Sequence, residues 1–496
     1  MSTKTLRKVR PSANGRHAAD AAIRAAGKPA GRAKPDAFDA EVARFHWEPQ
    51  PEGQKIVGEL VHDFLNACPM AAELCEKMKS HTGTRFVDWV DHIQTPKNEA
   101  IAGRLKAAGF THEPMPGAEG HWVHRGAMFP AIILVSGSTT RVAVKVESVP
   151  DFLAAWKVPV DQRIEGLPHS QIRRACAFTG KNAELWVIER HGYRGFDVPK
   201  ADPAACLRSV EHLERFRRRK RDFERDEDGF NHAADLIDAA VADLGVDWTC
   251  DLFFASEREY WQRKNRAGQV QKARQDKLGL GWANHDHHTY RSSRQNFKHL
   301  MRCLFKLGFT CRERFYAGAE AGWGAQVVEQ PVAGITIFAD VDMSAEELRG
   351  NFAREGLPER KSLGTVGLWC GLHGEAFLQA GMHHLECQFD WHLLKAQLQA
   401  EAHVKTMDPF TTFPYLRQAF TEGEKWSVDP RRIFMLLEKG QITARQAEQF
   451  HRHGALGSHL ENLERNDGYK GFNQQGVSDI ISKTDPRLHA FDKTGA

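Results

Sequence analysis

Two segments of the chain share one order of features, and this repeat limits the possible folds more than any other feature does. Asp91 and His92 in the first copy correspond to Asp286 and His287 in the second. In each copy a strand-like run is followed by a helix-like run and then by three short strand-like runs. Because the copies lie about 195 residues apart, they predict duplicated domains and not a solenoid of short repeats.

The order of one strand, one helix and three strands, written βαβββ, predicts an α+β fold. In the second copy the pieces are WANHDHHTYR, NFKHLMRCLFKLG, CRERFYA, GAQVVEQ and GITIFADV. A further mixed unit extends from GMHHLECQFD to SDIISKTD and contains a helical insertion around 430–454. Paired βαβββ units form the half-barrels of the vicinal oxygen chelate fold, in which a metal lies in the cup that they enclose. We therefore expect this fold, with repeated units around a metal.

The pattern divides the chain into five parts. Residues 1–45 form a basic tail without apolar periodicity, for which we expect disorder. The other parts are a degenerate βαβββ unit at 55–160, a connecting α/β region with a charged helix at 161–250, a unit with His287 and Arg291 at 251–355, and a C-terminal unit with His384, Glu461 and the insertion at 356–490. The tail fits an organellar transit peptide or a disordered bacterial extension. We favour the extension and a cytoplasmic location.

Composition argues against several other classes of protein. The nine cysteines are scattered and never form CxxC, which indicates a reducing compartment and not a zinc ribbon. No apolar run approaches the roughly 20 residues that cross a bilayer. The net charge of +4 gives no reason to expect a polyanionic partner, and we interpret the block FRRRKRDFERDED as a solvated helix face and not as a nucleic-acid site. We expect neither membrane nor nucleic acid as a partner.

Histidine is unusually frequent, with 25 residues, and its densest cluster is the segment NHDHHTYR. Since side chains alternate between the two faces of a strand, His285, His287 and Arg291 would share one face. A neutral imidazole can bind a metal, while a guanidinium further along the strand grips the carboxylate of a substrate bound to that metal. A polar sheet face without any ligand would show the same pattern, so the motif alone leaves both interpretations open.

Two further clusters could complete a metal site. In GMHHLE the neighbouring His383 and His384 would face opposite sides of a strand, so only one of them can enter a given site. In HLENLER a carboxylate could complete a set of two histidines and one acid. Such a set leaves three coordination positions open, which suits Fe(II) that binds both a chelating substrate and dioxygen.

The segment from about Tyr260 to Asp485 resembles the 2-oxoadipate dioxygenase/decarboxylase family in seven pieces that occur in the same order. These are REYWQRKNRAGQVQKARQ, DHHTYR, GAQVVEQP, HHLECQF, YLRQAFT, HLENLER and YKGFNQQGVSDIISKTD. The resemblance implies that His287, His384 and Glu461 bind Fe(II) and that Arg291 binds the substrate carboxylate. It also implies that a 2-oxo acid and dioxygen react, since this family converts 2-oxoadipate to 2-hydroxyglutarate and CO2.

Other acidic and amide residues rank below these four. We expect Glu329 and Gln418 to support the site or to have structural roles. Glu386 stands where the family more usually has a small polar residue, and this departure bears on the exact substrate. Glu147 and Asp340 close corresponding fourth strands, and they rank below Glu461 as metal ligands.

The first copy departs from the second at one decisive position. Pro96 stands where the second copy has Arg291, so the first copy keeps the fold without the carboxylate-binding residue, and we expect a structural role for His92.

Two other functions remain open. A lyase or isomerase that uses Mn, Zn or Mg as a Lewis acid would share the fold and the histidines but would consume no oxygen. A metal-free binding or structural protein would retain no metal on purification.

Overall fold

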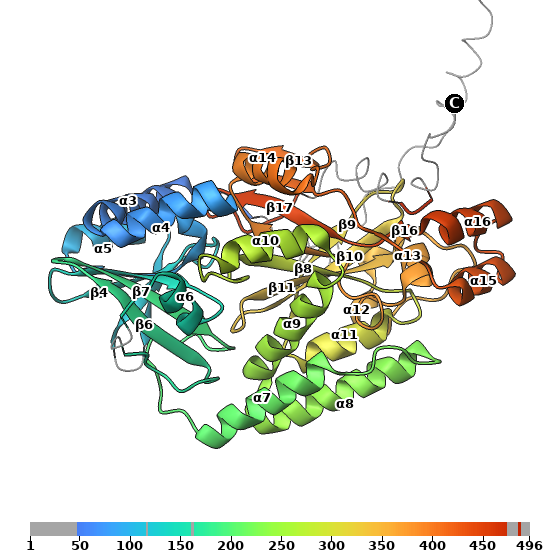
Figure 1. Ribbon diagram of the computed structural model, residues 1–496, viewed down its shortest axis with the longest axis horizontal. Coiled ribbons are helices and arrows are strands. Elements are labelled where there is room, and N and C mark those ends of the chain that lie inside the picture. Colours follow the sequence, from blue (N-terminus) through green and yellow to red (C-terminus); the bar gives the residue numbers. More distant parts are fainter. Residues whose placement is uncertain (1–46, 116–117, 160–162, 474–484, 488–496) are drawn as a thin grey trace, which may run out of the picture. The chain divides into compact units, whose positions relative to one another are not determined.

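Figure 1 shows the computed structural model, which describes residues 47–115, 118–159, 163–473 and 485–487. The tail at 1–45 and residues 474–484 of the last family-like piece lie outside the described residues. Two large sheets, of seven and of eight strands, dominate the described part.

The first βαβββ unit belongs to the seven-stranded sheet, whose order is β2-β3-β4-β1-β5-β7-β6. Its elements are β1 (Val90–Pro96), α5 (Glu99–Ala107), β2 (Thr111–Met115), β3 (Ala118–Val123) and β4 (Ala131–Val135). β1 pairs with β4 in parallel. A shorter βαββ unit follows, with β5 (Thr140–Lys145), α6 (Val149–Ala155), β6 (Ile172–Thr179) and β7 (Ala183–Arg190). The sheet therefore continues beyond residue 160.

Two complete units form the eight-stranded sheet, whose order is β13-β14-β17-β12-β8-β11-β10-β9. The first contains β8 (His285–Arg291), α11 (Phe297–Lys306), β9 (Thr310–Tyr316), β10 (Trp323–Gln330) and β11 (Ile335–Asp342). The second contains β12 (His384–Gln388), α14 (Trp391–Ala402), β13 (Thr411–Phe413), β14 (Leu416–Phe420) and β17 (His459–Arg465). β8 pairs with β11 in parallel, and β12 pairs with β17 in the same way.

In both sheets the first strands of the two units pair antiparallel, β1 with β5 and β8 with β12. Gly109 and Gly308 follow the helices of the two equivalent units with φ of 86° and 83°. This left-handed conformation suits glycine after a helix and explains why the Gly-Phe-Thr motif recurs. The connectivity confirms the predicted α+β fold of the vicinal oxygen chelate type.

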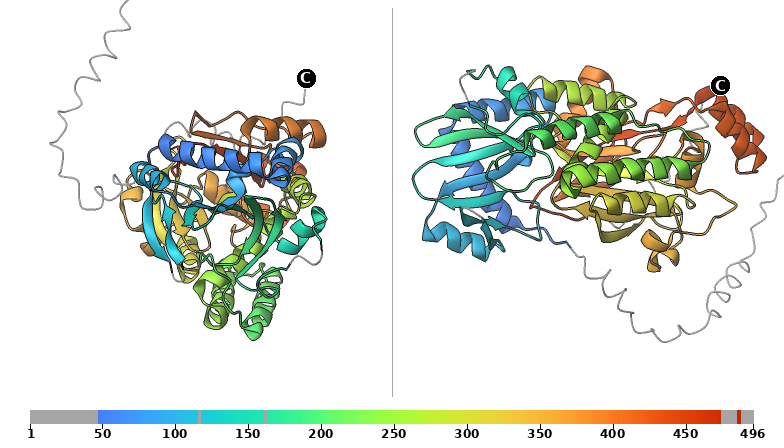
Figure 2. Two further views of the ribbon diagram at one scale, coloured as in Figure 1. Left: turned by 90° about the vertical axis from the view of Figure 1, so that its left-hand side faces the viewer. Right: turned by 90° about the horizontal axis from the view of Figure 1, so that it is seen from below.

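Helices cover one face of the eight-stranded sheet, as Figure 2 shows for the green segment that contains α8 (Asp226–Leu244) and α9 (Val246–Gln262). The ring of Phe254 on α9 lies 5.5 Å from that of His288 and 6.1 Å from that of Tyr290. His288 and Tyr290 therefore pack into the core, and His287, Thr289 and Arg291 point to the other face.

The remaining described elements connect or flank the sheets. They are α3 (Pro51–Ala67), α4 (Pro69–Lys77), the π-helix Met78–Thr82, the 3₁₀ helices Phe86–Trp89 and Glu347–Arg349, α7 (Pro203–Arg217), α10 (Arg266–Asp276), α12 (Phe352–Glu355), α13 (Thr365–His373), and an insertion made of β15 (Lys425–Trp426), α15 (Pro430–Glu438), α16 (Ala444–His453) and β16 (Ala455–Leu456). The insertion lies between β14 and β17, in the region where we expected helices.

The charged block FRRRKRDFERDED does not form the solvated helix face that we expected. α7 ends at Arg217 and α8 begins at Asp226, so the block crosses the break between two helices. Arg219 and Arg221 are buried and both form ion pairs with the buried Glu257, at 3.0 and 2.5 Å. Two of the arginines thus hold this connection against the core.

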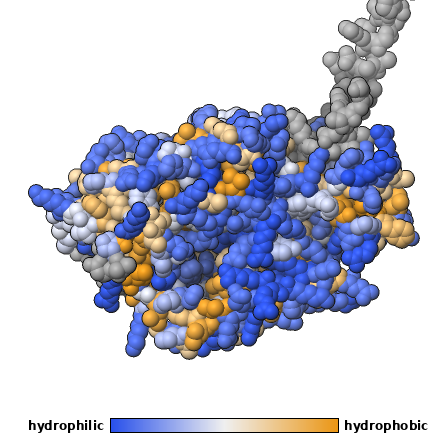
Figure 3. Space-filling view, in the orientation of Figure 1, coloured by the Kyte–Doolittle hydropathy of each residue, from blue (hydrophilic) through white to orange (hydrophobic). Residues whose placement is uncertain are grey.

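No helix among the described residues is both long and apolar enough to cross a membrane. In the view of Figure 3 most of the surface is hydrophilic, with smaller hydrophobic areas.

Candidate metal centre

A bulge in β8 places Asp286 beside His287. Glu386 of β12 pairs with His287 and the next residue, Cys387, pairs with His285, so Asp286 is an extra residue on β8. Asp286 Oδ1 lies 3.0 Å from His287 Nδ1. With Nδ1 held by a carboxylate, the Nε2 atom of His287 is left to face the cup, which is the usual arrangement of a metal-binding histidine.

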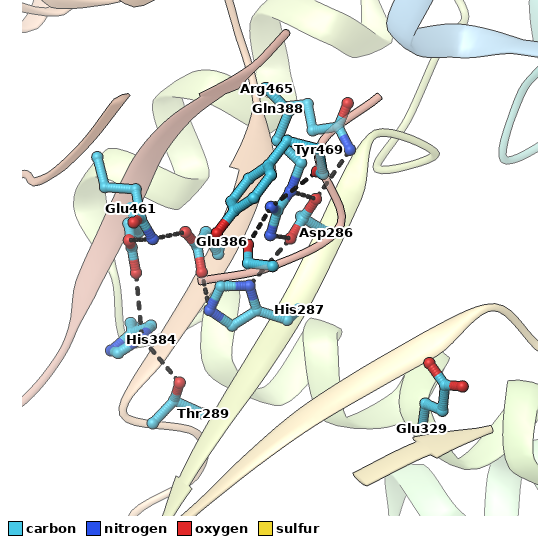
Figure 4. A network of polar contacts seen from close by, with 12 residues as sticks. Asp286, His287, Thr289, Glu329, His384, Glu386, Gln388, Glu461, Arg465 and Tyr469 are labelled. Atoms are coloured by element: carbon cyan, nitrogen blue, oxygen red, sulfur yellow. Dashed lines mark hydrogen bonds and ion pairs between the residues drawn. The ribbon is translucent and has the colours of Figure 1, made fainter. Parts of the chain in front are cut away.

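Asp286 is itself held from two further strands (Figure 4). Arg465 at the end of β17 donates to both of its carboxylate oxygens, at 2.8 and 2.9 Å, and Gln388 of β12 donates to it at 2.8 Å. Burial alone would raise the pKa of Asp286, but Arg465 and His287 outweigh burial and lower it. The aspartate therefore stays ionised and fixes the His287 ring.

His287, His384 and Glu461 each offer one ligand atom, and these three atoms all lie within 4.8 Å of one another. All three residues are buried, and they come from β8, β12 and β17. His384 Nε2 lies 3.2 Å from Glu461 Oε2 and 2.7 Å from Thr289 Oγ1. Burial, with a smaller effect from His287, lowers the pKa of His384 well below its usual range, so its imidazole is neutral and can bind a metal.

A second carboxylate, Glu386, adjoins the cluster. Its Oε2 contacts His287 Nε2, and the Gln418 amide donates to both Glu386, at 2.9 Å, and Glu461, at 3.1 Å. Burial raises the pKa of Glu386, and burial together with the Glu386 carboxylate raises the pKa of Glu461 well above its usual range. Two buried carboxylates this close to each other repel when ionised, and a bound cation would remove that cost.

A cavity opens next to the cluster. Its lining contains His287, Thr289 and Arg291 of β8, His383, His384, Gln418, Glu461, Asp340 and Asn473, together with the aromatic rings of Phe315, Trp323, Phe338, Phe410, Phe420 and Phe472. The cup thus combines aromatic walls with several polar groups that converge on one space, which is typical of a small-molecule site.

The structure brings together the residues that the family resemblance implies. His287, His384, Glu461 and Arg291 all line the cavity, and Gln418 joins them. Glu329 lies apart from the cluster (Figure 4), with Lys470 at 3.4 Å and Arg312 at 3.5 Å. The alternative ligand Glu147 pairs with Lys272 at 2.9 Å and does not reach the cavity.

Two of the predictions about which histidines share a strand face are wrong. His285 does not share the cavity face with His287, because the bulge turns it toward His288, whose ring is 5.3 Å away. His383 and His384 both line the cavity, because β12 begins only at His384 and the strict alternation of a strand does not yet apply to His383. No signal in the sequence would have located the bulge.

The N-terminal sheet repeats the support of the histidine but not the other candidate metal ligands. Asp91 is again an extra residue in its strand, lies 2.7 Å from His92 Nδ1 and is held by Arg190 at the end of β7. The pairing register equates His384 with Arg141 and Glu461 with Trp186. An arginine and an indole cannot replace an imidazole and a carboxylate as ligands. The register also equates Glu386 with Ala143.

This comparison predicts a structural role for His92. His92→Ala should leave the metal content and any turnover within about twofold of wild type, because Arg141 and Trp186 stand at the positions equivalent to His384 and Glu461. The variant removes the hydrogen-bond partner of Asp91, so the free energy of unfolding should fall by about 1–3 kcal/mol. Thermal melting would detect this loss. Loss of turnover in a variant with an unchanged melting temperature and metal content would place the site in the N-terminal sheet instead.

A divalent metal fits the donor set at the cup. Two imidazoles and one carboxylate from three different strands form the ligand set that is typical of non-haem Fe(II), and such a set leaves positions open for other ligands. The held Nδ1 of His287 and the adjacent buried carboxylates are the observations that support this fit.

These features define a class: the chain is an α+β protein of the vicinal oxygen chelate fold with a buried candidate metal centre between two βαβββ units. No family model matches it. No curated protein matches it either.

Several solved structures are similar to the chain. A glyoxalase superfamily protein from Ralstonia eutropha has 12% identity and a TM-score of 0.30, with 54% of this chain and 96% of that chain covered. A mutant of 4-hydroxymandelate synthase from Streptomyces coelicolor has 12% identity and a TM-score of 0.24, with coverages of 69% and 96%. The uncharacterized protein YdcJ from Shigella flexneri, which includes domain DUF1338, has 10% identity and a TM-score of 0.23, with coverages of 52% and 73%.

Proposed function

We propose that this protein is an Fe(II)-dependent dioxygenase and decarboxylase of a 2-oxo acid, with 2-oxoadipate as the substrate and 2-hydroxyglutarate and CO2 as the products. The observation that carries the proposal is the cluster of His287, His384 and Glu461 on the wall of an aromatic-lined cavity that also contains a buried arginine. The resemblance of residues 260–485 to the 2-oxoadipate family supports the choice of substrate.

The three ligands and their supports would hold the metal. Bound Fe(II) would supply a chelation point for the 2-oxo acid and the means of activating dioxygen. The chain keeps the His287 ring oriented through Asp286 and Arg465, and it keeps Glu461 in place through the Gln418 amide. Such outer contacts typically contribute tenfold to a hundredfold in metal affinity.

The other end of the substrate would be bound by Arg291. This residue is only 2% exposed, and its Nε and Nη1 atoms have no hydrogen-bond partner within the described part of the chain. A buried guanidinium without a partner is costly, and a substrate carboxylate would satisfy it with two parallel hydrogen bonds. A dicarboxylic 2-oxo acid provides that second carboxylate.

The aromatic walls would exclude water from the reacting end. Phe338 and Phe472 both pack against the His287 ring, with ring centroids 4.9 Å from it in each case. The overall reaction balances without a further reductant, because 2-oxoadipate and O2 contain the same atoms as 2-hydroxyglutarate and CO2. The two small-molecule partners are therefore a 2-oxo acid and dioxygen.

Oxygen uptake tests the proposal directly. Protein reconstituted anaerobically with Fe(II) should consume oxygen when a 2-oxo acid is added, with one CO2 released per O2 consumed. A panel of 2-oxo acids of different length, with and without a second carboxylate, would identify the substrate. Tight metal binding without oxygen uptake for any member of the panel would contradict the proposal.

One contact favours a second candidate, a lyase or isomerase with a redox-silent metal. Glu386 contacts the same Nε2 atom of His287 that a metal would take, so Glu386 could serve as a fourth protein ligand. Four ligands would leave only two positions, enough for a chelated substrate but not for dioxygen as well. Product formation in the absence of oxygen, lost in Glu386→Ala, would support this candidate over the dioxygenase.

A further inference from the structure

Asp340 lies beside Arg291, four residues along the sheet from the level of His287. β8 and β11 are parallel, and their register pairs Arg291 with Asp340 and His287 with Thr336. Both Arg291 and Asp340 are 2% exposed and both line the cavity. The two residues therefore form one polar group that is separated from His287 by four residues along each strand.

One carboxylate oxygen of Asp340, Oδ1, is buried without a hydrogen-bond partner in the described part of the chain. Although Arg291 is the neighbour of Asp340 in the register, the two side chains form no ion pair within 4.0 Å. The contrast is Asp342 on the same face of β11, which accepts hydrogen bonds from the backbone of Gly364, Val366 and Gly367 at 2.8–3.0 Å and so caps α13. Buried polar groups without partners are rare, and one that faces a cavity points to a ligand.

The protonation of Asp340 suits a hydrogen-bond donor. Burial raises the pKa of this carboxyl to about 8, and the nearby Arg291 lowers it only in part. The groups that act on Arg291 in turn are Asp340, Cys370, Asp342 and Asp485. At neutral pH the Asp340 carboxyl is thus mostly protonated and can donate its O–H.

The N-terminal sheet offers an internal comparison. Arg291 and Asp340 are register partners in β8 and β11 of the eight-stranded sheet. The equivalent partners in β1 and β4 of the seven-stranded sheet are Pro96 and Val135. The polar pair is therefore present in the half that contains the metal ligands and absent from the half that lacks them. A pair needed only for the fold would be expected in both halves.

We propose that Asp340 is a substrate-binding residue that, together with Arg291, binds the far carboxylate of the substrate, with Asp340 donating an O–H and Arg291 donating N–H groups to the same carboxylate. The inference rests on the proposed function, in which the 2-oxo acid group at the other end of the substrate binds the metal. It assigns selectivity for dicarboxylic over monocarboxylic 2-oxo acids to these two residues.

Binding, measured without turnover, tests this inference. Protein loaded with Fe(II) under anaerobic conditions is titrated calorimetrically with 2-oxoadipate and with 2-oxohexanoate, which has the same chain length and only one carboxylate. Wild type should prefer 2-oxoadipate. Asp340→Val, which places the residue of the N-terminal sheet at this position, should weaken 2-oxoadipate binding roughly tenfold to a hundredfold and leave 2-oxohexanoate binding unchanged.

A conservative variant and a pH series separate ligand binding from a structural role. Asp340→Asn keeps a donor and should bind 2-oxoadipate within about threefold of wild type at pH 7. From pH 7 to pH 9 the affinity of wild type should fall as Asp340 ionises and repels the substrate, whereas that of Asp340→Asn should stay level. Glu329→Gln, a carboxylate change on β10 outside the cavity, is the matched control and should behave as wild type.

The outcomes distinguish this inference from the proposed function. If Asp340→Asn loses binding as Asp340→Val does, or if wild type does not discriminate between the two acids, the inference is wrong. If the discrimination and its dependence on Asp340 are found but no oxygen is consumed, the proposed oxygenation fails and the carboxylate site stands.

Discussion

Single replacement of His287, His384 or Glu461 by alanine should remove the metal from the purified protein and abolish turnover. Each residue offers one of the three candidate ligand atoms in the set, all within 4.8 Å of one another. Loss of one contact in the outer shell of a metal site already costs tenfold to a hundredfold in affinity, so loss of a ligand should cost more. Elemental analysis of protein reconstituted with Fe(II) would measure the effect, with about one iron per chain expected in wild type.

Two variants serve as controls for this experiment. His92→Ala removes the histidine at the equivalent position of the N-terminal sheet and should retain one iron per chain. Glu386→Gln keeps the shape of the neighbouring side chain and should retain the metal if three ligands suffice. Iron content that survives the alanine change at all three positions would show that the metal is bound elsewhere.

The sequence predicted the fold because the repeat has a period and an internal order that few architectures share. The Gly-Phe-Thr motif after each helix and the Asp-His pair in each first strand recur for physical reasons, a left-handed turn and a supported imidazole. The sequence also indicated which residues could lie together, since two histidine clusters and one acidic cluster stand on three separate runs, and the structure brings one residue from each within 4.8 Å of the others.

Other features depend on contacts between distant strands that no local pattern reveals. The bulge at Asp286 changes the face on which His285 lies, and bulges have no strict sequence signature. Glu386 is close to His287 only because β12 and β8 pair in one particular register. Asp340 was considered as a metal ligand, but its register beside Arg291 places it four residues away from the level of His287.

Arg291 is the residue on which the choice of substrate depends most strongly. It lies on the same strand and face as His287, in a buried position where its guanidinium has unsatisfied donors. Burial lowers the pKa of Arg291, with Asp340 as the largest opposing effect, but a guanidinium remains charged at any pH at which the protein would be assayed. A fixed positive charge with a planar fork is well suited to orient one carboxylate at a defined distance from the metal.

Arg291→Lys should therefore reduce turnover of a dicarboxylic 2-oxo acid on the order of a hundredfold while the iron content stays at wild type. Lysine keeps the charge but not the two parallel hydrogen bonds, and a misplacement of about 1 Å can cost this much in rate. Oxygen-uptake kinetics on protein of known iron content would measure the loss. Arg417→Lys on β14, whose side chain pairs with Glu464 outside the cavity, is the matched control and should keep full activity. Wild-type turnover in Arg291→Lys would leave the metal centre in place but would remove the structural support for a dicarboxylic substrate, since Asp340 alone cannot neutralise the second carboxylate.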